Sequence, residues 1–256
     1  MTAAALAALI VLFFVTSIIG VVTGSNSLIT VPVMFQFGID EKVAVATNMF
    51  GLTFMAIGAT IPFVRTGRIE AGRITPLLIL TSIGSAIGAA LVGLITNESI
   101  KLIVSVAMIA VALFIVLGRN GSGTREREGI GNPNRWHFSA AGLIAVFLLA
   151  IYGGLYSGGY VTILTAALVA FFGMTYGGAI AATKLINVFS SGIATLVFMW
   201  QRLVDYRLGA ILAVTMFFGA YVGAHYATKM NDVWLRRIFL TAVFILAAKT
   251  LFDFIK

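Results

Sequence analysis

Residues 17–32 read SIIGVVTGSNSLITVP, and residues 152–167 read YGGLYSGGYVTILTAA. Each stretch interrupts a long apolar run with glycines and with small hydroxyl or amide side chains. An unpaired backbone group is very costly in hydrocarbon, so such a break persists only where it is buried in protein or lines a wet cavity. Two breaks at corresponding places in the two halves of a chain are typical of a transporter whose broken helices meet near the membrane midplane.

The composition indicates an integral membrane protein. Of the 256 residues, 60% are hydrophobic and 10% are charged, whereas about 25% of a soluble domain is charged. The net charge is +8, but the basic residues are scattered in short connections between apolar runs. This distribution fits orientation in a lipid bilayer and does not predict a nucleic-acid partner. The chain has no cysteine, which excludes thiolate catalysis and cysteine-ligated metals, and we expect no cofactor.

The lengths of the apolar runs suggest how the chain crosses the bilayer. Most have the roughly 20–25 residues that cross about 30 Å of hydrocarbon. Two contain the interrupted stretches and would reach about 52 Å as straight helices. A helix that enters, turns at the break and returns fits this length, and a single tilted or kinked crossing is the alternative. The runs lie at 3–37, 43–64, 74–96, 99–118, 138–172, 176–200, 206–229 and 233–254.

The two halves of the chain repeat each other. A shift of about 135 places sets Gly24 on Gly159 and Gly38 on Gly173, and a polar triplet in one half (ATN) falls close to its counterpart in the other (ATK). We therefore predict one transmembrane repeat at 1–118, a polar linker at 119–137 and a second transmembrane repeat at 138–256.

The predicted fold class is an all-α polytopic membrane protein with two inverted repeats of four hydrophobic segments. The first segment of each repeat is a broken or re-entrant helix. If both long runs are hairpins, each repeat crosses the bilayer an odd number of times and the repeats are inverted. If each crosses once, both termini lie inside. The excess of basic residues fits either topology.

Lys184 is the most informative single residue. It lies about eight residues, or roughly 12 Å, into the run 176–200, which places it toward the midplane. An ammonium group there costs about 3 kcal/mol unless it is paired or hydrated. One interpretation is a cationic ligand for an anionic substrate. The other is a lysine that snorkels to the interface or pairs with backbone carbonyls.

Amide and hydroxyl side chains accompany this lysine. Asn48 occupies the position related to Lys184 by the repeat, and Asn187 follows Lys184 by three residues on the same helix face. Thr47 and Thr183 precede the pair in each half. These groups can donate to the oxygens of an anion, or they can hydrogen-bond between helices.

The breaks supply the remaining candidates for substrate binding. They lie at or near the start of a returning half-helix, where free N–H groups attract oxyanions. The alternative is that the glycines allow close helix crossing and the hydroxyls satisfy the backbone. The candidates are Ser25, Asn26 and Ser27 in the first break, and Ser157, Gly158, Gly159 and Tyr160 in the second.

Small residues elsewhere predict helix packing. Gly84 and Gly88 in the first half, and Gly219 and Gly223 in the second, form faces with the small-xxx-small spacing. Such faces serve internal packing or a homodimer equally well. Asp205, like Glu70 at the matching position of the first half, is expected to cap a helix start.

Several of these stretches together resemble the sulfite exporter TauE/SafE family. The resemblance covers essentially the whole chain and implies a secondary transporter of sulfite, sulfonates or related small anions in the bacterial inner membrane. It is carried by GVVTGSNSLITVP at 20–32, GGLYSGG at 153–159, the ATN and ATK triplets at 46–48 and 182–184, and RIEAGR at 68–73 with VDYRLG at 204–209.

We therefore expect a transporter of a small sulfur-containing anion that works by alternating access, with export as the direction. An uncoupled anion channel and a carrier for another small organic anion are the alternatives. A membrane-embedded enzyme is not expected, because the chain has two histidines, no cysteine and no pair of carboxylates within an apolar run.

Overall fold

The computed structural model describes residues 3–24, 26–67, 71–100 and 139–231, with residues 102–104, 106, 233–235, 237–238 and 241. Within these ranges all regular structure is helical, and no strand occurs. Helices α1, α3, α8 and α9 and residues Ile74–Leu94 of α4 are long and apolar enough to cross a membrane. The prediction of an all-helical, multi-pass membrane protein is confirmed. The helices are α1 (Ala3–Thr23), α2 (Ser27–Gln36), α3 (Glu41–Arg65), α4 (Ala71–Leu94), α6 (Ala140–Leu155), α7 (Tyr160–Phe172), α8 (Tyr176–Trp200) and α9 (Tyr206–Ala227).

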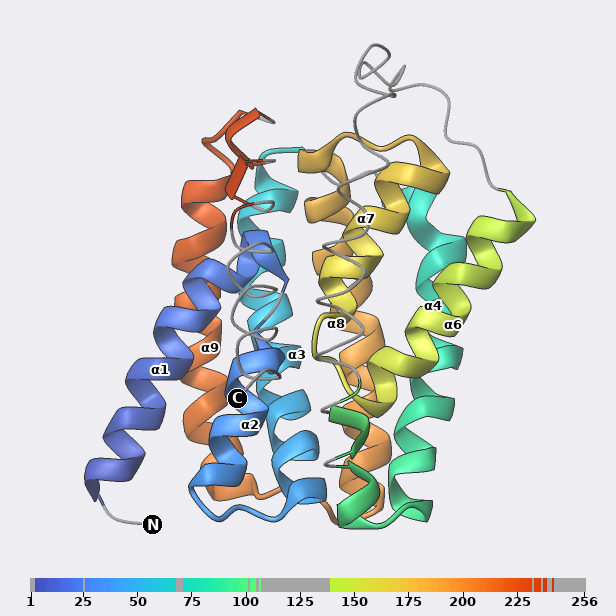
Figure 1. Cartoon of the computed structure of the whole chain (residues 1–256). Coiled ribbons are helices and arrows are strands. Elements are labelled where there is room, and N and C mark those ends of the chain that lie inside the picture. The colour runs from blue at the N-terminus through green and yellow to red at the C-terminus, as the bar shows by residue number, and fades with distance from the viewer. Residues whose placement is uncertain are drawn as a thin grey trace.

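Each of the two long apolar runs is divided into two helices. In Figure 1, α1 rises from the lower end of the molecule and α2 returns toward that end, whereas α6 descends from the upper end and α7 returns upward. Gly24 and Gly159 lie in the two breaks with φ of +71° and +75°, a conformation that favours glycine. Gly38 and Gly173, which follow α2 and α7, also have positive φ. Glycines matched by the sequence repeat therefore have matching backbone conformations.

Polar side chains define several helix starts. The carboxylate of Asp40 accepts from the backbone N–H groups of Lys42 and Val43 at the start of α3. Asp205 caps α9 in the same way, so its predicted capping role is confirmed. These caps satisfy backbone donors that have no partner within the helix. Glu70, the predicted counterpart of Asp205, and the predicted linker at 119–137 lie outside the described residues.

The helices form two bundles that lie side by side in Figure 1. In the first bundle, α9 packs on α1 and α3; in the second, α4 packs on α6 and α8. Helix α2 lies with the first bundle and α7 with the second. Contact between α3 and α8 joins the two bundles. Each bundle thus combines helices from both halves of the chain.

The predicted glycine faces pack the helices within each bundle. A Cβ atom added to Gly88 would overlap the carbonyl oxygen of Ile151 on α6, and one added to Gly223 would overlap the carbonyl oxygen of Ile18 on α1. Gly84 and Gly219 make similarly close approaches one turn earlier. The four glycines therefore allow the backbones of α4 and α6, and those of α9 and α1, to come into direct contact.

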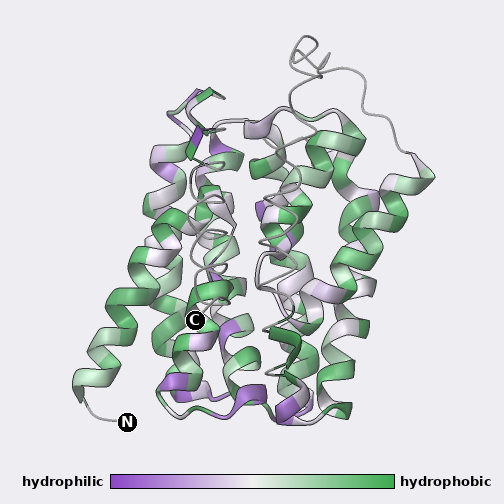
Figure 2. Cartoon of the chain, in the orientation of Figure 1, coloured by the Kyte–Doolittle hydropathy of each residue, from purple (hydrophilic) through white to green (hydrophobic). Residues whose placement is uncertain are grey.

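Apolar side chains cover the outward faces of the helices as well as the interior. Large apolar side chains such as Ile79, Ile144 and Leu196 are about 60% exposed on the outward faces of the helices. Polar residues such as Ser17 and Thr47 are fully buried between helices. Figure 2 shows green, apolar residues along the outer helices and purple residues gathered mainly at the helix ends. The apolar outward surface is therefore suited to contact with lipid chains.

A pair of alanine substitutions in α4 tests the glycine packing. Gly88→Ala is expected to destabilise the protein by about 1–3 kcal/mol or more, because the new methyl group overlaps the α6 backbone. Gly72→Ala introduces the same methyl group where no atom lies within 4 Å, so we expect unchanged or slightly higher stability. Thermal unfolding of the two purified variants in detergent checks this. Equal melting temperatures would contradict the backbone contact between α4 and α6.

Candidate functional site

The two breaks contact each other in the interior. The hydroxyls of Ser27 and Ser157 lie 2.7 Å apart and share a hydrogen bond. The Thr162 hydroxyl, in the first turn of α7, donates to the carbonyl of Thr23 at the end of α1, over 2.7 Å. The phenol of Tyr156 donates to the carbonyl of Ser27 over 3.1 Å. Side chains of the second break therefore satisfy backbone carbonyls of the first, as the low dielectric of a membrane interior requires.

Close backbone approach is possible because the first break contains a glycine. A Cβ atom on Gly24 would lie 2.8 Å from the backbone nitrogen of Thr162 and 3.0 Å from the carbonyl carbon of Val161. The end of α1 thus lies directly against the first turn of α7. The starts of α2 and α7, which carry partial positive charge, consequently lie in the same region.

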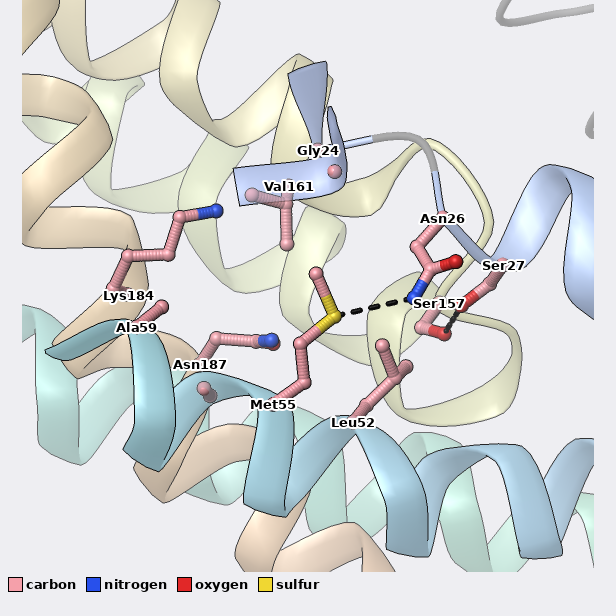
Figure 3. A pocket seen from close by; sticks show the side chains of 12 residues that line it. Gly24, Asn26, Ser27, Leu52, Met55, Ala59, Ser157, Val161, Lys184 and Asn187 are labelled. Carbon is pink, nitrogen blue, oxygen red and sulfur yellow. Dashed lines mark hydrogen bonds between the residues drawn. The ribbon is translucent and has the colours of Figure 1, made fainter. Parts of the chain in front are cut away.

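A small cavity lies beside this contact. Its volume is about 20 Å³, which is enough for an ordered water molecule. Figure 3 shows side chains from both bundles pointing toward the cavity. The lining residues are Gly20, Gly24, Asn26, Ser27, Leu52, Met55, Ala56, Ala59, Ser157, Val161, Lys184 and Asn187.

Among the described residues, Lys184 is the only charged one that lines the cavity. Its side chain is 4% exposed and extends toward Val161 in Figure 3. Within the part of the chain that the structure describes, its ammonium group has no hydrogen-bond or ion-pair partner. The snorkelling alternative does not fit such burial. A buried charge without a partner is costly, so this group is available to an anion.

Two amide side chains that line the same cavity have polar atoms available for further hydrogen bonds. The Asn187 amide, three residues after Lys184 on α8, has no side-chain partner among the described residues. The Asn26 amide nitrogen donates to the Met55 sulfur over 3.2 Å and, more weakly, to the Ser17 hydroxyl over 3.4 Å. The Asn26 side-chain oxygen is buried without a partner. The arrangement offers several donors for a single acceptor group.

Asn48 differs from Lys184, although the repeat relates their positions. Its amide nitrogen donates to the Ser27 hydroxyl over 2.9 Å, and its carbonyl oxygen accepts from Thr30 over 2.8 Å. Asn48 therefore holds α2 against α3, and it does not line the cavity. The two equivalent positions are thus used differently in the two halves.

The structure places the other predicted site residues around the cavity or away from it. Asn26, Ser27, Ser157, Lys184 and Asn187 line it. Thr47 accepts from the backbone nitrogen of Asp205 over 3.0 Å, and Thr183 donates to the Ile180 carbonyl over 2.8 Å, so both hydroxyls serve helix structure. Gly158, Gly159 and Tyr160 form the second break, where the Gly158 carbonyl accepts from Tyr152 and the Tyr160 hydroxyl is buried without a partner. Ser25 lies outside the described residues.

The apolar part of the lining was not predicted from the sequence. Leu52, Met55 and Ala59 lie four, seven and eleven residues after Asn48, on the same face of α3. Helical spacing from Asn48, a predicted site residue that does not itself line the cavity, leads to these positions, but their apolar side chains carry no signal that separates them from other apolar residues of α3.

Comparison with known proteins identifies the family. The model described as "Sulfite exporter TauE/SafE" matches residues 8–250. The chain belongs to the sulfite exporter TauE/SafE family. The predicted resemblance is therefore confirmed, and the membership agrees with a multi-pass membrane protein. This is a membrane transporter family, which is not an enzyme class.

Curated relatives with transporter names match most of the chain. A "Probable membrane transporter protein ORF9" from Sinorhizobium sp. is 27% identical over 97% of this chain and 93% of its own length. "Probable membrane transporter protein YfcA" from Escherichia coli is 26% identical over 95% of this chain and 89% of its own length. A Bacillus subtilis relative, "Probable membrane transporter protein YunE", is 22% identical over 84% of this chain and 83% of its own. No solved structure matches the chain significantly.

Two asparagine substitutions distinguish a residue that stabilises the helix packing from one that only lines the cavity. Asn48→Ala is expected to lower stability by about 1–3 kcal/mol, because it removes hydrogen bonds to Ser27 and Thr30 inside the bundle. Asn187→Ala makes the same chemical change at a residue whose side chain has no partner, so its stability is expected to stay close to wild type. Thermal unfolding in detergent measures both. A larger loss for Asn187→Ala would show that its amide is structural.

Proposed function

We propose that this chain is a secondary transporter of a small sulfur-containing anion, such as sulfite or an organosulfonate. It exports the anion across the bacterial inner membrane by alternating access. The observation that carries the proposal is the Lys184 ammonium, which is buried, unpaired among the described residues, and directed into a cavity between two broken helices. The family description supports the substrate class.

The lining of the cavity has the chemistry that an oxyanion needs. Lys184 supplies one positive charge, and Asn26, Asn187, Ser27 and Ser157 supply neutral donors. The N-terminal turns of α2 and α7 add partial positive charge. None of the described residues that line the cavity is a carboxylate, which would repel the anion. Hydrogen bonds from a charged donor to an oxyanion are about twice as strong as neutral ones.

The two bundles offer a mechanism for alternating access. Asn26, Ser27 and Met55 come from the first bundle, while Ser157, Lys184 and Asn187 come from the second. A site shared by two bundles opens to one side or the other when the bundles rotate about it. The opposite directions of the two hairpins, and the matching φ of Gly24 and Gly159, support two inverted repeats at 1–118 and 138–256.

The small size of the cavity favours a carrier over a channel. A conducting pore requires a continuous wet path, whereas the lining polar residues Asn26, Ser27 and Lys184 are each at most 4% exposed. A carrier passes through such a closed state in each cycle. Saturable exchange of labelled anion by reconstituted protein, competed by unlabelled anion, distinguishes this carrier from an uncoupled channel.

Binding to the purified protein tests the proposed site. We expect sulfite or a sulfonate to bind, and Lys184→Ala to weaken that binding by about 10- to 100-fold, because a charged hydrogen bond is lost. Sulfite, sulfoacetate, taurine and sulfate serve as ligands in calorimetric titrations. Lys229→Ala removes the same charge from an exposed position after α9 and is the control.

The outcomes bear on different parts of the proposal. Unchanged binding by Lys184→Ala would remove this residue from the site and leave the helix starts as the anion ligands. Failure of all four compounds to bind to the wild-type protein would argue against sulfur oxyanions and for another class of substrate.

A further inference from the structure

Met55 occupies the space between the donor groups of the two bundles. In Figure 3 its side chain extends from α3 between Asn26 on one side and Lys184 and Asn187 on the other. The residue is 6% exposed and lines the cavity. A cavity as small as about 20 Å³ remains because this thioether takes up the centre of the site.

The contacts of Met55 resemble those expected of a bound acceptor. The Asn26 amide nitrogen donates to its sulfur over 3.2 Å. A thioether is a weak hydrogen-bond acceptor, so one of the two hydrogen bonds that this buried amide nitrogen donates goes to a poor partner. An anionic oxygen accepts much more strongly. Exchange of the sulfur for an anion oxygen is therefore favourable for Asn26, and it would also give Lys184 and Asn187 a partner.

The side chain of Met55 is itself flexible, and a glycine lies beside its end. Its terminal methyl group lies against Gly20 of α1, where an added Cβ atom would come within 3.1 Å of that methyl. Methionine is unbranched and has three rotatable side-chain bonds, so it changes shape more readily than leucine. The branched neighbour Leu52 lines the same cavity but makes no polar contact with Asn26.

We propose that Met55 is a displaceable plug that holds the place of the anion in the empty transporter and limits the size of the sulfonate. The thioether withdraws when the anion binds, and Asn26 transfers its hydrogen bond from sulfur to an anion oxygen. The withdrawn side chain then forms the wall against which the substituent on the sulfonate packs. This inference rests on the proposed transport of sulfur-containing anions, and it makes Met55 the determinant of chain length.

Binding of methanesulfonate and butanesulfonate to purified protein tests the size limit. Wild type is expected to prefer methanesulfonate. Met55→Ala removes three heavy atoms from the site, and butanesulfonate is three methylenes longer than methanesulfonate. The ratio of the two dissociation constants is therefore expected to shift toward butanesulfonate by at least about 10-fold, the lower end of what one methylene is worth in a pocket. Met49→Ala is the control, since Met49 lies on the same helix, is 2% exposed and does not line the cavity. It should keep the wild-type ratio.

A measurement on the wild-type protein tests displacement directly. The chain has 9 methionines, which can be labelled with ¹³C in their methyl groups, and Met55→Leu identifies the Met55 resonance by its loss. Saturating methanesulfonate is expected to shift the Met55 resonance and to leave the Met49 resonance in place. This readout does not depend on whether Met55→Ala folds.

Two results would overturn the inference alone. One is binding of both sulfonates with the same ratio in Met55→Ala as in wild type. The other is an unchanged Met55 resonance in protein that has bound methanesulfonate. Failure of the wild-type protein to bind any sulfonate or sulfite would instead overturn the proposed function, and this inference with it.

Discussion

The architecture depends on the need to satisfy backbone polar groups away from water. Breaking a helix inside a membrane leaves several N–H and C=O groups without partners. Here the second break satisfies the first, because Thr162 and Tyr156 of the second donate to carbonyls of Thr23 and Ser27 in the first. Glycine at position 24 brings the two backbones close enough for this exchange. The same contact brings the starts of α2 and α7 into one region. The arrangement that satisfies the backbone carbonyls therefore also places the hydrogen-bond donors of two helix starts near each other.

Residues at matching positions in the two halves of the chain make different hydrogen bonds. In the first, Asn48 is bonded to Ser27 and Thr30 and holds α2 in place. In the second, the residues at the positions of Ser27 and Thr30 are Thr162 and Thr165, which bond to backbone carbonyls instead. Lys184, at the position of Asn48, is thereby left without a partner in the described part of the chain. Positions matched by the sequence repeat thus hold an amide in one half and an amine in the other, and the amide is the one bonded to a neighbouring helix among the described residues.

The sequence predicted the features that are local or repeated, and it missed those that depend on packing. Glycines 24 and 159 marked the breaks because a non-glycine residue rarely adopts their backbone conformation. Lys184 was conspicuous because a charge in an apolar run is costly. Met55 could not be singled out, since an apolar residue in a membrane helix has the same pattern whether it faces lipid, core or cavity. Asn48 and Asn187 looked alike in the sequence, and only their neighbours in space distinguish them.

The crossing of helices between the bundles has a consequence for how the chain is made. Helix α4 is synthesised with the first half but finds its packing partners, α6 and α8, only in the second. Until those helices have left the ribosome, the face of α4 with Gly84 and Gly88 must be covered by lipid or by a temporary partner. Helix α9, in turn, completes the first bundle only after all the helices of the second have been made. Membrane insertion can thus proceed segment by segment, but assembly of each bundle has to wait for helices from the other half of the chain.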